Sequence, residues 1–208
     1  MPVDAQHSDY IKALPMWEKC RDAADGQECV HAKGEKYLPK LSEQTPQEYK
    51  AYRERALFYE ATGRTIDGLS GMIFRRPPKF EIPASVNYLE TDIDTSGTPL
   101  LAFCERTVEE LLRTGRIALL ADFPPMDGVR TKAEEDAAGA RPYLKMLPAA
   151  SVINWRFERI ANRQRLTLAV IAEKYATRQD EYTWKEEDQL RALRLTQQTD
   201  EAGNPFLG

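Results

Sequence analysis

The 208-residue sequence predicts an α+β fold, in which a helical N-terminal half with a long amphipathic helix is followed by an antiparallel β-meander. Two observations lead to this prediction. Apolar residues before position 115 recur every three or four residues, which is typical of helices with one buried face. After Pro142 they form short runs separated by turn residues, which is typical of strands. We therefore expect a mainly helical region at residues 1–141 and a β-rich region at residues 142–208.

The first helix is expected over residues 8–24, where the apolar side chains suit one helical face. Pro15 is expected to mark a break or a restart, because proline removes a backbone donor inside a helix. Gly26 follows as a stop signal. Residues 27–44 are then expected to form a connector.

The clearest local signal begins a second helix at residues 45–48 (TPQE). Thr45 can cap the helix, Pro46 suits its first turn, and Glu48 can bond back to the cap. Apolar and small residues continue at helical spacing up to the prolines at 77 and 78, which predicts one helix of about 25 residues. We expect one stripe of this helix to pack against a neighbouring helix or subunit: Gly63, Ile66 and Ser70.

A third helix is expected to begin at residues 98–99 (TP) and to stop at Gly115. A buried strand is expected directly after it, near residues 116–123, and a mobile loop near residues 126–140, which are small and polar without periodicity. In the β-rich region, turns are expected at residues 161–162, 180–188 and 200–204. The predicted strands of this region are residues 143–147, 152–157, 166–175 and 190–196.

Composition and charge exclude several classes of protein. The net charge of −4 and the isoelectric point near 5.4 argue against a protein that coats DNA through bulk charge. The longest apolar runs are strand-sized, far below the ~18 residues that cross a bilayer, and the N-terminus has no secretory signal. The chain has three cysteines, an odd number, which argues against a disulfide framework. It has only two histidines, so there are few candidates for histidine catalysis. We expect a soluble, intracellular protein.

No motif supplies a complete catalytic, cofactor or metal site. Residues 63–70 (GRTIDGLS) have leucine where a phosphate-binding loop needs lysine, and residues 68–71 lack the spacing of a serine nucleophile turn. Residues 92–97 (DIDTSG) begin like a calcium loop, but its twelfth position is Phe103 instead of glutamate. We therefore predict that the protein is not an enzyme and holds no cofactor. The open alternative is a metal-dependent hydrolase or nuclease with three carboxylates: Asp92, Asp94 and Glu105.

Four basic side chains lie near the end of the second predicted helix, with only Asp67 among them to offset their charge. A solvated or salt-bridged helix end explains such a group, because cations suit a helix C-terminus. The same residues are also the candidate contacts with a neighbouring subunit's acids or with DNA phosphates: Arg64, Arg75, Arg76 and Lys79.

Seven short stretches occur in one order along most of the chain. In the first half they are residues 17–22 (WEKCRD), 37–39 (YLP), 49–56 (YKAYRERA) and 65–78 (TIDGLSGMIFRRPP). Further on they are residues 92–94 (DID) with Gly97 and Leu100, residues 115–124 (GRIALLADFP) and residues 153–156 (INWR). Together they resemble the opening of a family of portal-like proteins of tailed bacteriophages.

The resemblance implies a structural role in the virion without catalysis. Portal proteins form a ring, usually of about twelve subunits, at one vertex of the capsid. The terminase motor drives DNA through this ring, and head–tail adaptor proteins later dock on it. The implied partners are further copies of the chain, terminase, adaptor proteins and double-stranded DNA, with no membrane. The implied locations are the virion and, during assembly, the cytoplasm of the bacterial host.

Family members are longer than this chain, so the resemblance implies that residues 142–208 form part of the portal's outer wing and are incomplete at the C-terminus. Two alternatives remain open at this point. One is a head–tail adaptor, or another phage interaction module, with the same layout of helices followed by strands. The other is the metal-dependent hydrolase described above.

Overall fold

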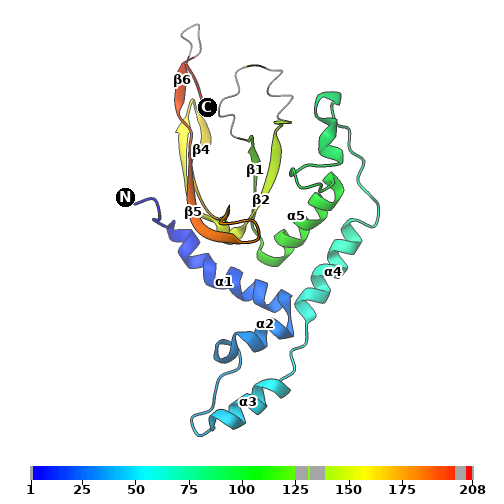
Figure 1. The fold of residues 1–208 in the computed structure, drawn as a ribbon, viewed down its shortest axis with the longest axis vertical. Coiled ribbons are helices and arrows are strands. Elements are labelled where there is room, and N and C mark those ends of the chain that lie inside the picture. Colours follow the sequence, from blue (N-terminus) through cyan, green and yellow to red (C-terminus); the bar gives the residue numbers. More distant parts are fainter. Residues whose placement is uncertain (1, 125–130, 132–138, 200–204, 208) are drawn as a thin grey trace. The chain divides into compact units, whose positions relative to one another are not determined.

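The structure is a computed structural model that describes residues 2–124, 131, 139–199 and 205–207 (Figure 1). Helices form most of the N-terminal half and antiparallel strands follow, so the predicted α+β class with a β-meander is confirmed. The chain divides into two compact units. The helical unit is Met16–Met146, and the strand unit is Met1–Pro15 together with Leu147–Gly208.

The helical unit begins within α1 (Ser8–Asp25), which continues through Pro15, where a break or restart was expected. Gly26 ends this helix with a φ of +85°, a conformation that favours glycine. The expected connector after it contains two short helical elements, α2 (Gln27–Ala32) and the 3-10 turn η1 (Gly34–Lys36). The first helix and its stop are therefore present, while the connector is more ordered than predicted.

The segment expected as one helix of about 25 residues forms two helices, α3 (Pro46–Arg55) and α4 (Ala61–Ile73). The expected capping box at Thr45 and Glu48 is present at the start of α3. The break follows from α2, whose side chains bond the backbone between the two helices. The His31 ring Nε2 donates to the Ala56 carbonyl (2.7 Å), and the Phe58 N–H donates to Gln27 Oε1 (3.1 Å). These bonds replace helical ones, so the break leaves those backbone groups satisfied.

The second half of the helical unit follows the prediction more closely. After the 3-10 turn η2 (Ala84–Glu90), α5 (Leu100–Thr114) ends at Gly115 in the left-handed conformation. Strand β1 (Ile117–Asp122) comes directly afterwards and pairs with β2 (Tyr143–Pro148). The expected burial of β1 is wrong, because its residues are half-buried or exposed in a sheet of only two strands. The start of α5 lies at Leu100, just after the expected residues 98–99, and no side chain caps it. The core of this unit includes three buried apolar residues from separate segments: Ile66, Ile93 and Phe103.

The strand unit is built on one antiparallel sheet in the order β3 (Val152–Ile160), β4 (Arg163–Arg178) and β5 (Trp184–Arg194). The expected turn between β3 and β4 lies at Ala161 and Asn162, both with positive φ. Strand β5 begins earlier than predicted, inside the acidic stretch expected to be a turn. Cross-strand pairing explains the difference, because residues 184–188 lie opposite residues 174–178 of β4. Two short strands, β6 (Gln197–Thr199) and β7 (Pro205–Leu207), pair with each other.

The N-terminal segment belongs to the strand unit and covers part of β3. The His7 N–H donates to the Ile153 carbonyl (2.9 Å), and the His7 ring stacks on Trp155. Asn154 Nδ2 donates to the Ala5 carbonyl (2.7 Å). Tyr10, at the start of α1, donates through its hydroxyl to the carbonyl of Ala150 (3.0 Å), in the 3-10 turn η3 (Ala149–Ser151). The first residues of the chain are therefore bonded to a sheet that lies more than 140 residues away in the sequence.

Two predicted features fall largely or wholly outside the described residues: the mobile loop near residues 126–140 and the turn at residues 200–204. In the described part of the chain, no helix has both the length and the apolar character needed to cross a membrane.

Candidate functional site

The four predicted contact residues form what we call the basic segment: Arg64, Arg75, Arg76 and Lys79. Arg64 lies on α4, Arg75 and Arg76 follow the end of α4 at Phe74, and Lys79 lies in the extended chain beyond two prolines. Proline disfavours the helical conformation of the residue before it, so Pro77 prevents α4 from continuing through Arg76. The last three cations therefore follow the helix instead of lying on it. All four are exposed.

The cations of the basic segment have no carboxylate partner among the residues that the structure describes. Arg64 lies over the ring of Tyr59, with its guanidinium carbon 5.2 Å from the ring centre. Arg75, Arg76 and Lys79 make no ion pair within the described ranges, in contrast to several other basic residues of the helical unit. An exposed group of this kind can receive phosphate oxygens or the carboxylates of another protein.

The predicted packing stripe, Gly63, Ile66 and Ser70, lies on the same helix. Ile66 and Ser70 are buried, and α4 packs against α5. Gly63 approaches the end of α1 so closely that a Cβ atom there would lie 2.9 Å from the Ala24 carbonyl oxygen. The stripe therefore contacts other helices of its own unit, while the residues that follow α4 face solvent.

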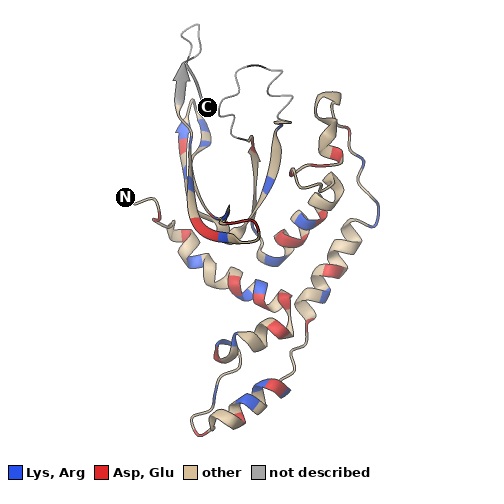
Figure 2. Ribbon diagram, in the orientation of Figure 1, with Lys and Arg blue, Asp and Glu red and all other residues tan. Residues whose placement is uncertain are grey.

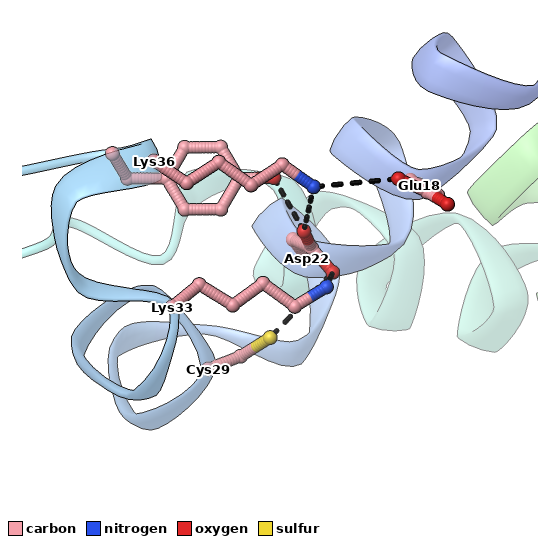
Figure 3. Close-up of polar contacts among 6 residues, drawn as sticks. Glu18, Asp22, Cys29, Lys33 and Lys36 are labelled. Carbon is pink, nitrogen blue, oxygen red and sulfur yellow. Dashed lines mark hydrogen bonds and ion pairs between the residues drawn. The ribbon is translucent and has the colours of Figure 1, made fainter.

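A second cluster, which the sequence did not indicate, surrounds Asp22 near the end of α1 (Figure 3). We call it the Asp22 cluster: Glu18, Asp22, Cys29, Lys33, Lys36 and Tyr37. Asp22 is 3% exposed and accepts hydrogen bonds from Lys33 Nζ, from the Tyr37 hydroxyl and from Lys36 Nζ (3.3 Å). Its Oδ1 also lies 3.6 Å from the Cys29 thiol. Lys36 reaches Glu18 as well, at 3.4 Å.

The electrostatics of this cluster favour a charged Asp22. Burial raises the pKa of its carboxyl, but hydrogen bonds from Lys33, Tyr37 and Lys36 together lower it by more than burial raises it. The net result is a pKa of about 2. Burial also raises the pKa of the Cys29 thiol, and the negative charge of Asp22 adds to that effect. Cys29 is therefore held as a neutral thiol beside a satisfied carboxylate. The arrangement ties α1 to α2 and η1 and leaves Asp22 poorly suited to act as a base.

The hydrolase hypothesis requires three carboxylates. Asp92 and Asp94 lie in the loop before α5, and Glu105 lies on α5 itself. Asp92 forms an ion pair with Arg141, and its Oδ1 accepts the Gly97 N–H (2.9 Å). Asp94 Oδ1 accepts the N–H groups of Ser96 (2.9 Å) and Thr98 (3.3 Å). Asp92 and Asp94 therefore close a turn, which is the common role of aspartate in such loops. Within the described residues, no group of three or more His, Cys, Asp and Glu side chains is placed to hold a metal ion.

The helical unit also contains an apolar cavity of about 320 Å³ beside the Asp22 cluster. Val30, Leu38 and Phe58 are among its lining residues, and Leu57 lies at its rim with 92% of its surface exposed. A cavity of this size and character can receive an apolar side chain. Lys19 and Tyr37 also line it, and the Tyr37 hydroxyl already donates to Asp22.

A scan against models of known protein families finds no family that matches the chain, and a search of curated proteins finds no similar sequence.

Proposed function

We propose that this protein is a portal-like structural protein of a tailed-phage virion, corresponding to the N-terminal portion of a portal subunit. The observation that carries the proposal is the ordered set of seven sequence stretches that resemble that family. In this role the chain contacts further copies of itself in a ring, and the assembled ring contacts terminase, head–tail adaptor proteins and double-stranded DNA. Its locations are the virion and, during assembly, the host cytoplasm.

Several of these stretches contribute to the packing of the helical unit. Asp22, in the stretch at residues 17–22, accepts a hydrogen bond from Tyr37, in the stretch at residues 37–39. Ile66 and Ser70, in the stretch at residues 65–78, are buried in the helical unit. The stretches are separate in the sequence, but residues of several of them pack in the same unit of the fold.

The exposed surface of the helical unit also supports an assembly role. Leu57, Tyr59, Met72 and Ile73 are large apolar side chains that remain mostly exposed, and the last two precede the cations of the basic segment. Apolar groups exposed next to unpaired charge are typical of surfaces that another molecule covers. A subunit of a ring has such surfaces by necessity, since each copy contacts two neighbours.

The proposal is tested by the mass and the shape of the purified protein. We expect light scattering to give a particle many times heavier than the 23.7 kDa chain, and electron microscopy to show closed rings. A single chain at all concentrations would contradict the proposal. Immunogold labelling of virions that contain the protein separates the portal from the adaptor, because a portal lies within the capsid vertex and an adaptor lies outside it, on the portal.

A further inference from the structure

The two ends of the sheet in the strand unit carry opposite charge. One end is the turn that joins β3 to β4, and we call residues 156–166 the basic end. It has four arginines and one glutamate, a net charge of +3. Arg156 pairs with Glu158 (3.3 Å), whereas its other arginines make no ion pair among the described residues: Arg159, Arg163 and Arg165. All four guanidinium side chains are exposed.

The other end is the turn that joins β4 to β5, and we call residues 174–188 the acidic end. It has five acids and three bases, a net charge of −2. Lys174 pairs with Glu186 (3.0 Å), and Lys185 pairs with Glu187 (2.8 Å). Glu181 and Asp188 are exposed and make no ion pair within the described ranges. Figure 2 shows the red of Asp and Glu where β4 turns into β5, with blue farther along the same sheet.

The two ends cannot neutralise each other within one copy. The turns lie at opposite ends of β4, which has 16 residues and spans about 50 Å along the strand. The charge of each end therefore stays available to a partner from outside the sheet. Another copy of the same sheet supplies both partners at once, since its acidic end matches the basic end of the first copy.

Exposed apolar side chains accompany the charges at both ends. Phe157 and Leu166 lie opposite each other at the basic end, so they share one face of the sheet. At the acidic end, Tyr182 and Trp184 are 84% and 65% exposed. Phosphates of duplex DNA would meet the charge of the basic end but not its apolar groups. A protein surface with aromatic side chains meets both, which favours a second copy over DNA.

We propose that the basic end of one copy binds the acidic end of the next, in a head-to-tail contact between sheets. The inference rests on the proposed function, because it names a surface through which copies of the chain meet in an assembly. The contact is heterologous: each copy offers one end and receives the other, so repetition produces a closed ring or an open chain. Charge complementarity sets the register of the copies, and the aromatic groups exclude water around it.

The test uses three variants of the whole chain. The basic-end variant carries Arg159→Gln, Arg163→Gln and Arg165→Gln, and the acidic-end variant carries Glu181→Gln, Glu187→Gln and Asp188→Asn. The control removes three cations from α3, which the article places in no contact between copies: Lys50→Gln, Arg53→Gln and Arg55→Gln. Circular dichroism first establishes that each variant is folded, and sedimentation at low and high salt then gives its state of association.

We expect each end variant alone to associate at least about tenfold more weakly than the unaltered chain, and high salt to weaken association of the unaltered chain. The control should keep its association. An equimolar mixture of the two end variants should form particles of two chains and no larger, because only one matching pair of intact ends remains. Particles of two chains in the mixture, without rings from the unaltered chain, would support this contact and contradict the portal proposal.

Three results would overturn the inference. If both end variants associate like the unaltered chain, the contact lies elsewhere, and the portal proposal stands if rings persist. If the unaltered chain remains single at high concentration, neither end binds a second copy. If the basic-end variant keeps its association but loses binding to a short DNA duplex, the basic end is a nucleic-acid surface instead.

Discussion

The Asp22 cluster and the basic segment both contain several cationic side chains, but those side chains have different surroundings. In the first, two lysines surround one buried carboxylate, and Tyr37 completes its hydrogen bonds. In the second, three cations follow a helix end and have no carboxylate partner among the described residues. The charge of the first is used inside the fold, whereas that of the second is available to a partner. Helix α4 connects the two, since Gly63 lies against Ala24, near Asp22, and Ile73 leads to the basic segment.

The largest expected effect is that of removing the Asp22 carboxylate. Asp22→Asn keeps the size of the side chain but removes the charged acceptor of the hydrogen bonds from Lys33, Lys36 and Tyr37, so we expect a decrease of about 2–3 kcal/mol in the free energy of unfolding. Asp25→Asn, at the exposed end of the same helix, is the matched control and should change it by less than about 0.5 kcal/mol. Urea unfolding measures both. Equal decreases would remove the contrast between paired and free charges.

Acid should weaken the Asp22 cluster next. The pKa of Asp22 is lowered to about 2 from 3.8, so its charge stabilises the fold fully above the unfolded value, and this contribution is lost as the pH falls through about 2. The shift corresponds to about 2 kcal/mol. The difference in unfolding free energy between the unaltered chain and Asp22→Asn should be constant near neutral pH and shrink below about pH 4. Parallel curves down to pH 2 would show that another group carries the effect.

Local sequence signals predicted much of the fold. The capping box at Thr45, the stop at Gly115 and the turn at residues 161–162 each depend on a few neighbouring residues, and each is present. The break between α3 and α4 was missed because its cause is distant. His31 and Gln27 bond to the backbone of residues 56–58, and nothing within that short segment indicates those partners.

The basic segment and the Asp22 cluster also differ in whether neighbouring residues in the sequence indicate them. The basic segment was visible in the sequence, because four cations with one acid among them form a local excess of charge. The Asp22 cluster was not, because its donors are 11, 14 and 15 residues away with no repeating spacing. Burial decides the role of Asp22, and burial depends on the packing of three elements. Composition near a single aspartate carries no such information.

Within α4, two glycines should respond in opposite directions. A methyl group at Gly63 would lie 2.9 Å from the Ala24 carbonyl oxygen, so Gly63→Ala forces backbone apart and should cost about 1–2 kcal/mol. Gly68 has open space at its Cβ position, so Gly68→Ala should stabilise the helix by about 0.5–1 kcal/mol. Thermal unfolding of the two variants compares them directly. Stabilisation by both would mean that α4 does not approach α1 at Gly63.

The smallest effect on stability is expected in the basic segment. Arg75→Gln, Arg76→Gln and Lys79→Gln together should change the free energy of unfolding by less than about 0.5 kcal/mol, because these side chains are exposed and make no ion pair in the described structure. If the segment meets phosphates, the same variant should bind a short DNA duplex at least about tenfold more weakly at low salt.

Bulk charge is the competing explanation, and a matched variant on α3 separates it. The matched variant also loses three positive charges, through Lys50→Gln, Arg53→Gln and Arg55→Gln. On this helix Lys50 lies 3.9 Å from Glu54, and Arg55 donates to the Ala51 carbonyl. If the cations of the basic segment touch phosphates directly, only the basic-segment variant should lower the salt dependence of binding, by about one unit of slope for each cation–phosphate pair that it removes. An equal decrease in both variants would mean that free cations contribute only through net charge, and the contrast with the Asp22 cluster would then concern stability alone.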